Sequence, residues 1–260
     1  MKKSIIVFDS GFGGISVLKR LVDSMPNEDY LYYGDSANAP YGPRSKEQVQ
    51  ELTLNAIADA KRTCEPKAIV IACSTATAAA REVLQRTYPD IPVIGILPAV
   101  EAAAASKSCP RVLVLATAGT IHSEAYRNIL SGIDSTAEIV SVPAPEIVHY
   151  VEGGMRERAA LMDSLAKSLA PYQAQKFDCV VLGCTHFPFA CDVIADVLGY
   201  PVQFFDGSML TTKQTEEALQ SRYTRSTDNR TGSIRIINSG NQQEYVRFAW
   251  ELFASELKFK

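Results

Sequence analysis

The sequence predicts an α/β protein built from two similar, pseudo-symmetric, doubly wound domains with parallel sheets. Three observations lead to this prediction. Short apolar runs alternate with amphipathic stretches along most of the chain, the runs lack the polar alternation of a half-exposed sheet, and strand-end motifs recur at a nearly constant offset. Continuous apolar strands that alternate with helices are typical of parallel sheets covered on both faces.

In the first part of the chain, apolar runs predict strands at 4–8, 30–33, 68–72 and 93–96. Helices are predicted at 14–25, 45–63, 76–88 and 100–106. The first has an apolar face that includes Leu18 and Leu21, and the second has Ser45 as its N-cap, a residue type favoured there. Residues 39–44 are rich in turn formers and predict a loop.

The pattern then restarts, with strands predicted at 111–115, 138–142, 179–182, 202–205 and 233–238. Helices are predicted at 123–130, 145–170 with a break at Gly153-Gly154, after Pro188, at 211–220 and at 243–253. The polar stretch 222–231 reads as a surface loop, and Trp250 as core of the last helix. We expect residues 1–95 and 208–260 to form one domain and residues 96–207 the other.

Two pairs of strand ends resemble each other. Residues 7–11 resemble 115–119 at an offset of 108, and residues 69–75 resemble 180–186 at an offset of 111. Ligands in parallel sheets bind beyond the carboxyl ends of the strands. If the two halves face each other, Cys73 and Cys184 approach an active site in the cleft between the domains from opposite sides.

Such a pair of thiols fits racemisation by two bases. One thiolate removes the α-proton of an amino acid, and the other group, as a thiol, returns a proton to the opposite face of the planar intermediate. Cysteine suits this role because both its thiol and its thiolate are accessible near neutral pH.

Composition excludes several other classes of protein. The 260 residues are 47% hydrophobic and 21% charged, with a net charge of -3, so there is no basic excess to hold nucleic acid or an anionic membrane. No apolar run approaches the roughly 18 residues of a spanning helix. The 6 cysteines form no CxxC pair, which argues against a zinc site or a disulfide framework. We expect reduced thiols, no metal, and a cytoplasmic protein.

Six motifs, in order and over almost the whole chain, resemble those of glutamate racemases. They lie at 9–14, 34–36 with 40–42, 72–76, 114–120 with Ser123 and Tyr126, 151–154 and 183–188. The resemblance implies interconversion of L- and D-glutamate without a cofactor, a role in supplying D-glutamate for peptidoglycan, and a homodimer. The first predicted strand begins close to Met1, and we expect no regulation by a peptidoglycan-precursor activator.

The resemblance also assigns roles. Cys73, assisted by Asp9, would deprotonate D-glutamate, and Cys184, assisted by His186, would deprotonate L-glutamate. Glu152 would be a further acidic group of the site. The substrate-binding positions would be Ser10, Pro40, Tyr41, Gly42, Ser74, Thr75, Thr117, Thr120 and Thr185. Hydroxyls and backbone N–H groups at strand-to-helix turns suit the carboxylates of a free amino acid.

Ser74 departs from the family, which usually has asparagine there. A shorter side chain at this position leaves open an aspartate or broad-specificity racemase of the same superfamily. Two further classes are a cysteine hydrolase built on Cys184 and His186, and a binding protein without activity. The spacing of two residues is a poor geometry for a hydrolytic triad, and a hydrolase has no use for the second cysteine.

Overall fold

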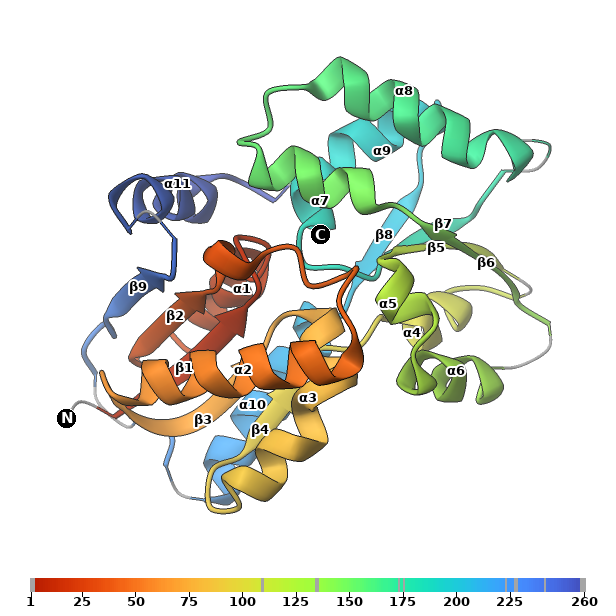
Figure 1. Ribbon diagram of the computed structural model, residues 1–260. Helices are drawn as coiled ribbons and strands as arrows, with labels where there is room; N and C mark the ends of the chain where they lie inside the picture. Colours follow the sequence, from red (N-terminus) through yellow and green to blue (C-terminus); the bar gives the residue numbers. More distant parts are fainter. Residues whose placement is uncertain are drawn as a thin grey trace. The chain divides into compact units, whose positions relative to one another are not determined.

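The computed structural model describes residues 3–108, 110–133, 136–172, 174, 176–222, 224–226, 229–240 and 242–257. The chain divides into two compact units, one formed by residues 1–96 and 208–255 and the other by residues 97–207 and 256–260. Each has one parallel sheet with helices on both faces (Figure 1), which confirms the predicted fold class. No helix in the described ranges is long and apolar enough to cross a membrane.

The sheet of the first unit has the strand order β4-β3-β1-β2-β9. Its strands are β1 (Lys3–Asp9), β2 (Tyr30–Gly34), β3 (Glu65–Ile71), β4 (Val93–Gly95) and β9 (Ile234–Asn238). Every pair of neighbours is parallel. The three central strands are almost entirely buried, because helices cover both faces.

Alternate residues of these strands face two helical layers. Ile6, Phe8 and Ile71 pack with α2 (Lys46–Lys61) and α3 (Ser74–Thr87) in one core. Helices α1 (Ile15–Ser24) and α10 (Ser208–Ser221) pack against each other, and α11 (Gln242–Ala254) contacts α1. A single turn, η1 (Ser36–Asn38), follows β2. Ser45 caps α2 through a reciprocal pair of hydrogen bonds with Gln48, as its residue type predicts.

The second unit has the strand order β6-β5-β7-β8. Its strands are β5 (Arg111–Ala116), β6 (Glu138–Pro143), β7 (Cys179–Leu182) and β8 (Gln203–Asp206), again all parallel. One face carries α7 (Pro145–Glu152), α8 (Arg158–Leu169) and α9 (Cys191–Leu198), and the other carries α4 (Val100–Ala104) and α6 (Glu124–Ser131). The shorter elements are α5 (Ala118–Ile121), η2 (Ala170–Tyr172) and η3 (Phe187–Ala190).

Two features differ from the sequence-based expectations. The short helix α5 was not predicted, because four residues carry too little periodicity. Trp250 is 41% exposed, so the prediction that it belongs to the core was wrong. The described residues of the polar stretch 222–231 are mostly exposed and lie outside helices and strands, which confirms the predicted surface loop. Buried carboxylates anchor it: Asp29 accepts hydrogen bonds from Arg230 and from Ser233, and Glu28 accepts one from the Ser226 amide. Cys179 is buried in the core, as its apolar strand predicts.

Candidate active site

In the first unit, two predicted site residues lie at the carboxyl ends of adjacent strands. Asp9 is the last residue of β1, and Cys73 comes two residues after the end of β3. The strands pair with Phe8 opposite Ile71, so both residues reach the same edge of the sheet. Cys73 is the N-cap of α3, and its Sγ accepts a hydrogen bond from the Ala76 amide at 3.4 Å.

The Cys73 thiol also contacts the loop that follows β1. Ser10 Oγ lies 3.4 Å from Cys73 Sγ. Asp9 is fully buried, and its Oδ1 accepts a hydrogen bond from the Gly11 amide at 2.9 Å. A Cβ on Gly14 would lie 2.6 Å from that of Asp9, so only glycine lets the start of α1 approach so closely. The loop is therefore built around the Asp9 carboxyl group.

The predicted substrate-binding loop 40–42 follows β2. Pro40 is exposed, whereas the Tyr41 ring is buried beside Phe8 and its hydroxyl donates to Asp35 Oδ2 at 2.6 Å. Burial, followed by the hydrogen bond and charge of Asp35, raises the pKa of Tyr41 far above its usual value. The phenol is therefore a fixed hydrogen-bond donor at neutral pH.

The second unit repeats this arrangement at the ends of β5 and β7. Thr117 caps α5: its Oγ1 accepts from the Thr120 amide at 3.2 Å and lies 3.0 Å from Thr120 Oγ1. A Cβ on Gly183 would lie 2.7 Å from that of Ala116, so glycine brings the end of β7 close to the end of β5. Cys184 follows directly, and these hydroxyls and the thiol share one edge of the sheet.

A chain of three side chains extends from Cys184. Its Sγ lies 3.5 Å from His186 Nδ1, and His186 Nε2 lies 2.6 Å from Glu152 Oε1. Burial by itself lowers the pKa of His186, but the hydrogen bonds and charges of Cys184 and Glu152 outweigh it and raise that pKa well above its usual value. Protonation of the imidazole, which lies between a sulfur and a carboxylate, is thus favoured.

These distances concern two sequence-based predictions, one about Glu152 and one about the spacing of Cys184 and His186. Glu152, at the end of α7, contacts a histidine 34 residues away and so has a definite partner. The spacing of Cys184 and His186, taken as poor for a triad, still brings them within hydrogen-bond distance because the chain turns directly after β7. The remaining objection to a hydrolase is the second cysteine, Cys73.

The predicted residues are divided between the two units. The first unit has Asp9, Ser10, Pro40, Tyr41, Gly42, Cys73, Ser74 and Thr75, and the second has Thr117, Thr120, Glu152, Cys184, Thr185 and His186. Ser74, Thr75 and Thr185 are buried at the starts of their turns.

Asp35, Asn38 and Ser239 are not among the predicted site residues, but the structure joins them to Tyr41. Asp35 accepts from Asn38 and Ser239 as well as from Tyr41. Their position in the sequence could have indicated a role, because Asp35 and Ser239 each follow a strand of the same sheet.

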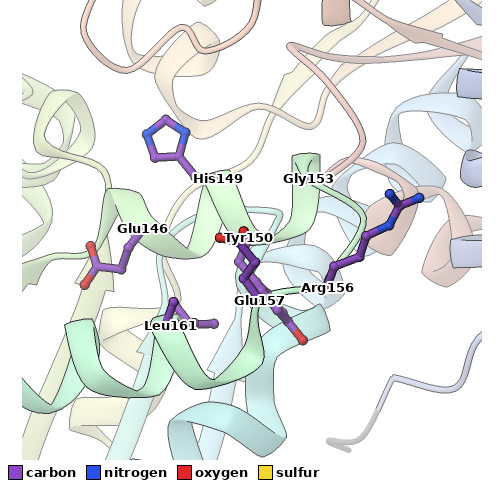
Figure 2. A pocket seen from close by; sticks show the side chains of 8 residues that line it. Glu146, His149, Tyr150, Gly153, Arg156, Glu157 and Leu161 are labelled. Atoms are coloured by element: carbon purple, nitrogen blue, oxygen red, sulfur yellow. The ribbon is translucent and has the colours of Figure 1, made fainter.

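A separate hollow of about 500 Å³ lies along α7 and the start of α8 (Figure 2). It is lined by Glu146, His149, Tyr150, Gly153, Arg156, Glu157, Ala160 and Leu161. None of these lining residues is a predicted site residue. The predicted catalytic side chains therefore lie outside this hollow.

Known proteins that resemble this chain are racemases, in agreement with the motifs at its strand ends. The Asp/Glu/hydantoin racemase family profile matches residues 7–215. The chain is 40% identical over 245 residues to a glutamate racemase of Clostridium perfringens, which covers 94% of both chains. It is 38% identical over 252 residues to the glutamate racemase of Clostridium novyi, covering 96% of this chain and 97% of that one. The protein belongs to the Asp/Glu/hydantoin racemase family.

Solved structures agree as well. A glutamate racemase isoform of Bacillus anthracis superposes with a TM-score of 0.85 at 29% identity, over 99% of this chain and 96% of that one. The glutamate racemase of Francisella tularensis, solved in complex with D-glutamate, superposes with a TM-score of 0.80 at 28% identity, over 99% and 96% of the two chains. The two-unit fold is that of these enzymes.

Proposed function

We propose that this protein is a glutamate racemase that interconverts L- and D-glutamate by transferring a proton between the substrate and two cysteines, without a cofactor. The observation that carries the proposal is the repeated cysteine at a strand end, each with a polar partner. Cys73 contacts Ser10, and Cys184 contacts the His186–Glu152 pair. The curated relatives named above bear the same enzymatic name.

The reaction divides into two proton transfers. In one direction the Cys184 thiolate takes the α-proton of L-glutamate, and the electron pair left on the α-carbon delocalises into the α-carboxylate. The Cys73 thiol then gives its proton to the opposite face of that carbon, yielding D-glutamate and a Cys73 thiolate. The reverse reaction begins at Cys73, so no atom or electron is gained or lost overall.

The neighbouring side chains assist each thiol. The imidazolium of His186 stabilises the Cys184 thiolate by charge and hydrogen bond, and Glu152 keeps that imidazole protonated. We assign Asp9 to assist Cys73 by hydrogen bonding and proton exchange with the thiol, and not by charge, because a carboxylate would repel a thiolate. Because the α-proton is weakly acidic, the intermediate also needs donors around its carboxylate. We assign this task to Ser10, Thr75, Thr117, Thr120 and Thr185. The loop Pro40–Gly42 is assigned to binding a substrate carboxylate equally in the ground state and in the intermediate.

Ser74 bears on substrate identity. Its side chain is buried directly after Cys73, where a hydroxyl has a shorter reach than the asparagine usual in the family. Replacement Ser74→Asn should lower KM for glutamate if glutamate is the natural substrate. A protein specialised for aspartate would instead lose activity on aspartate without gaining activity on glutamate.

We further propose that the enzyme works in the cytoplasm as a homodimer and supplies D-glutamate for peptidoglycan. Reducing conditions there keep both thiols free. Sedimentation of the purified protein tests the dimer, and D-glutamate dependence of a strain lacking the gene tests the supply role.

The direct test of the reaction is proton NMR in D2O with purified protein and no added cofactor. Loss of the α-proton signal and inversion are followed separately for L-glutamate, D-glutamate and both aspartates. Exchange and inversion on glutamate support the proposal. Exchange on aspartate alone would retain the mechanism and change the substrate, and exchange on none of the four by folded, reduced protein would refute the proposed activity.

A further inference from the structure

Two serine–aspartate hydrogen bonds lie at opposite ends of the strand pair β2 and β9. Asp29 precedes β2 and accepts from Ser233 Oγ, just before β9, at 2.8 Å. Asp35 follows β2 and accepts from Ser239 Oγ, just after β9, at 2.6 Å. Both carboxyl groups are buried. The two bonds are chemically alike, but only the second lies at the strand edge where the catalytic motifs gather.

Asp35 is the centre of the second group. Its Oδ2 accepts from the Tyr41 hydroxyl at 2.6 Å, and Asn38 Nδ2 donates to both carboxylate oxygens at 3.0 and 3.1 Å. With Ser239, three side chains donate to one buried carboxylate. Such a carboxylate acts as a structural anchor, because hydrogen bonds to a charged acceptor are stronger than those between neutral groups.

Ser239 contacts the same loop at a second point. The Ala37 amide donates to Ser239 Oγ at 3.1 Å, so this hydroxyl accepts from the loop backbone while it donates to Asp35. The preceding residue adds another contact, since Asn238 Nδ2 donates to Ser36 Oγ at 2.9 Å. The end of β9 therefore holds the segment that begins at Asp35 and continues to Gly42.

We propose that Ser239 is a positioning residue for substrate binding, acting through Asp35 and Tyr41 on the loop Pro40–Gly42. The inference depends on the proposed function, which places a substrate carboxylate at this loop. A loop ordered before the substrate arrives loses less conformational freedom on binding. The loop takes no part in proton transfer, so its loosening should weaken substrate binding and spare the chemical step.

The test compares three variants by steady-state kinetics on both glutamate enantiomers. Ser239→Ala removes both contacts and should raise KM roughly three- to tenfold, the effect of losing one or two modest hydrogen bonds, with kcat little changed. Ser239→Thr keeps the hydroxyl at a partly exposed position and should restore a wild-type KM. Ser233→Ala is the matched control, because it removes the equivalent bond to Asp29 and should leave KM unchanged.

Hydrogen–deuterium exchange supplies a readout that needs no activity. In Ser239→Ala, amides of residues 36–39, 41 and 42 should exchange faster than in wild type, the Ala37 amide above all. Unchanged exchange there would overturn the inference, as would faster exchange with an unchanged KM. A fall in kcat at constant KM would also overturn it, by indicating a chemical role. Absence of glutamate turnover in the wild-type protein is a different result: it refutes the proposed function and removes the substrate role of Ser239 with it.

Discussion

His186 Nε2 lies 2.6 Å from Oε1 of Glu152, which joins the turn after β7 to the end of α7. The histidine is 3% exposed, so little water screens this pair. Its other nitrogen faces Cys184. The carboxylate can therefore influence the thiol through the imidazole without touching it.

Replacement Glu152→Gln should lower kcat/KM for racemisation roughly 10- to 100-fold, comparable to the loss of a hydrogen bond between charged groups. Enantiomers have equal free energies, so kcat/KM must fall equally in both directions. The directions are separated by the α-deuterium isotope effect. It should grow for L-glutamate, since the step begun by Cys184 becomes slower, and change less for D-glutamate.

Glu146→Gln is the control for this variant. Glu146 lies on the same helix, and its carboxylate accepts a hydrogen bond from Ser168. The Glu146→Gln variant should retain wild-type kinetics. An isotope effect in Glu152→Gln that increases only for D-glutamate would contradict the assignment of Glu152 to the Cys184 side.

The two cysteines can be tested one at a time. Cys73→Ser and Cys184→Ser should each reduce racemisation by roughly 100-fold or more, because an alcohol is a far weaker acid than a thiol and proton transfer typically contributes this much. Cys64→Ala removes another buried thiol of the first unit and should keep its activity. Near-normal turnover by either serine variant would rule out the two-thiol mechanism.

The raised pKa of His186 has a consequence for stability. Protonation of this histidine favours the folded state, since its folded pKa lies above the unfolded value of about 6.5. That contribution is fully present below pH 6.5 and is lost as pH rises through the folded pKa. The free energy of unfolding of wild type, relative to His186→Gln, should therefore be larger at pH 6 than at pH 9. Urea titrations at the two pH values measure it; the opposite slope would mean that burial outweighs the charges of Cys184 and Glu152.

Asp29 should matter for stability and not for catalysis. Its buried carboxylate accepts from Arg230 Nη2 at 2.5 Å and from the Ser233 amide at 2.7 Å. Asp29→Asn should lower the free energy of unfolding by about 1.5–3 kcal/mol, the range for hydrogen bonds to a charged group. Urea denaturation would show it, with the exposed Asp23→Asn as control. A change of KM without loss of stability would contradict this structural role.

The sequence alone predicts the parallel α/β class and most strands of both sheets. An apolar run such as 179–182 predicts a buried strand, because a strand covered on both faces needs apolar residues at every position. The same reasoning directs attention to the carboxyl ends of strands, where Asp9, Cys73 and Cys184 are found. Burial of a strand and the position of its end can both be predicted because they depend on consecutive residues.

Contacts between distant residues were decided only by the tertiary structure. Ser239 is 204 residues from Asp35, and Glu152 is 34 residues from His186. A serine after a strand or a glutamate at a helix end has many local explanations, and its partner depends on which strands pair and how each helix packs. The exposure of Trp250 could not be predicted for the same reason. An aromatic residue on an amphipathic helix does not show which face of that helix other elements will cover. The catalytic candidates can be predicted from residue types and their order along the chain. The residues that position them cannot, because their contacts depend on packing.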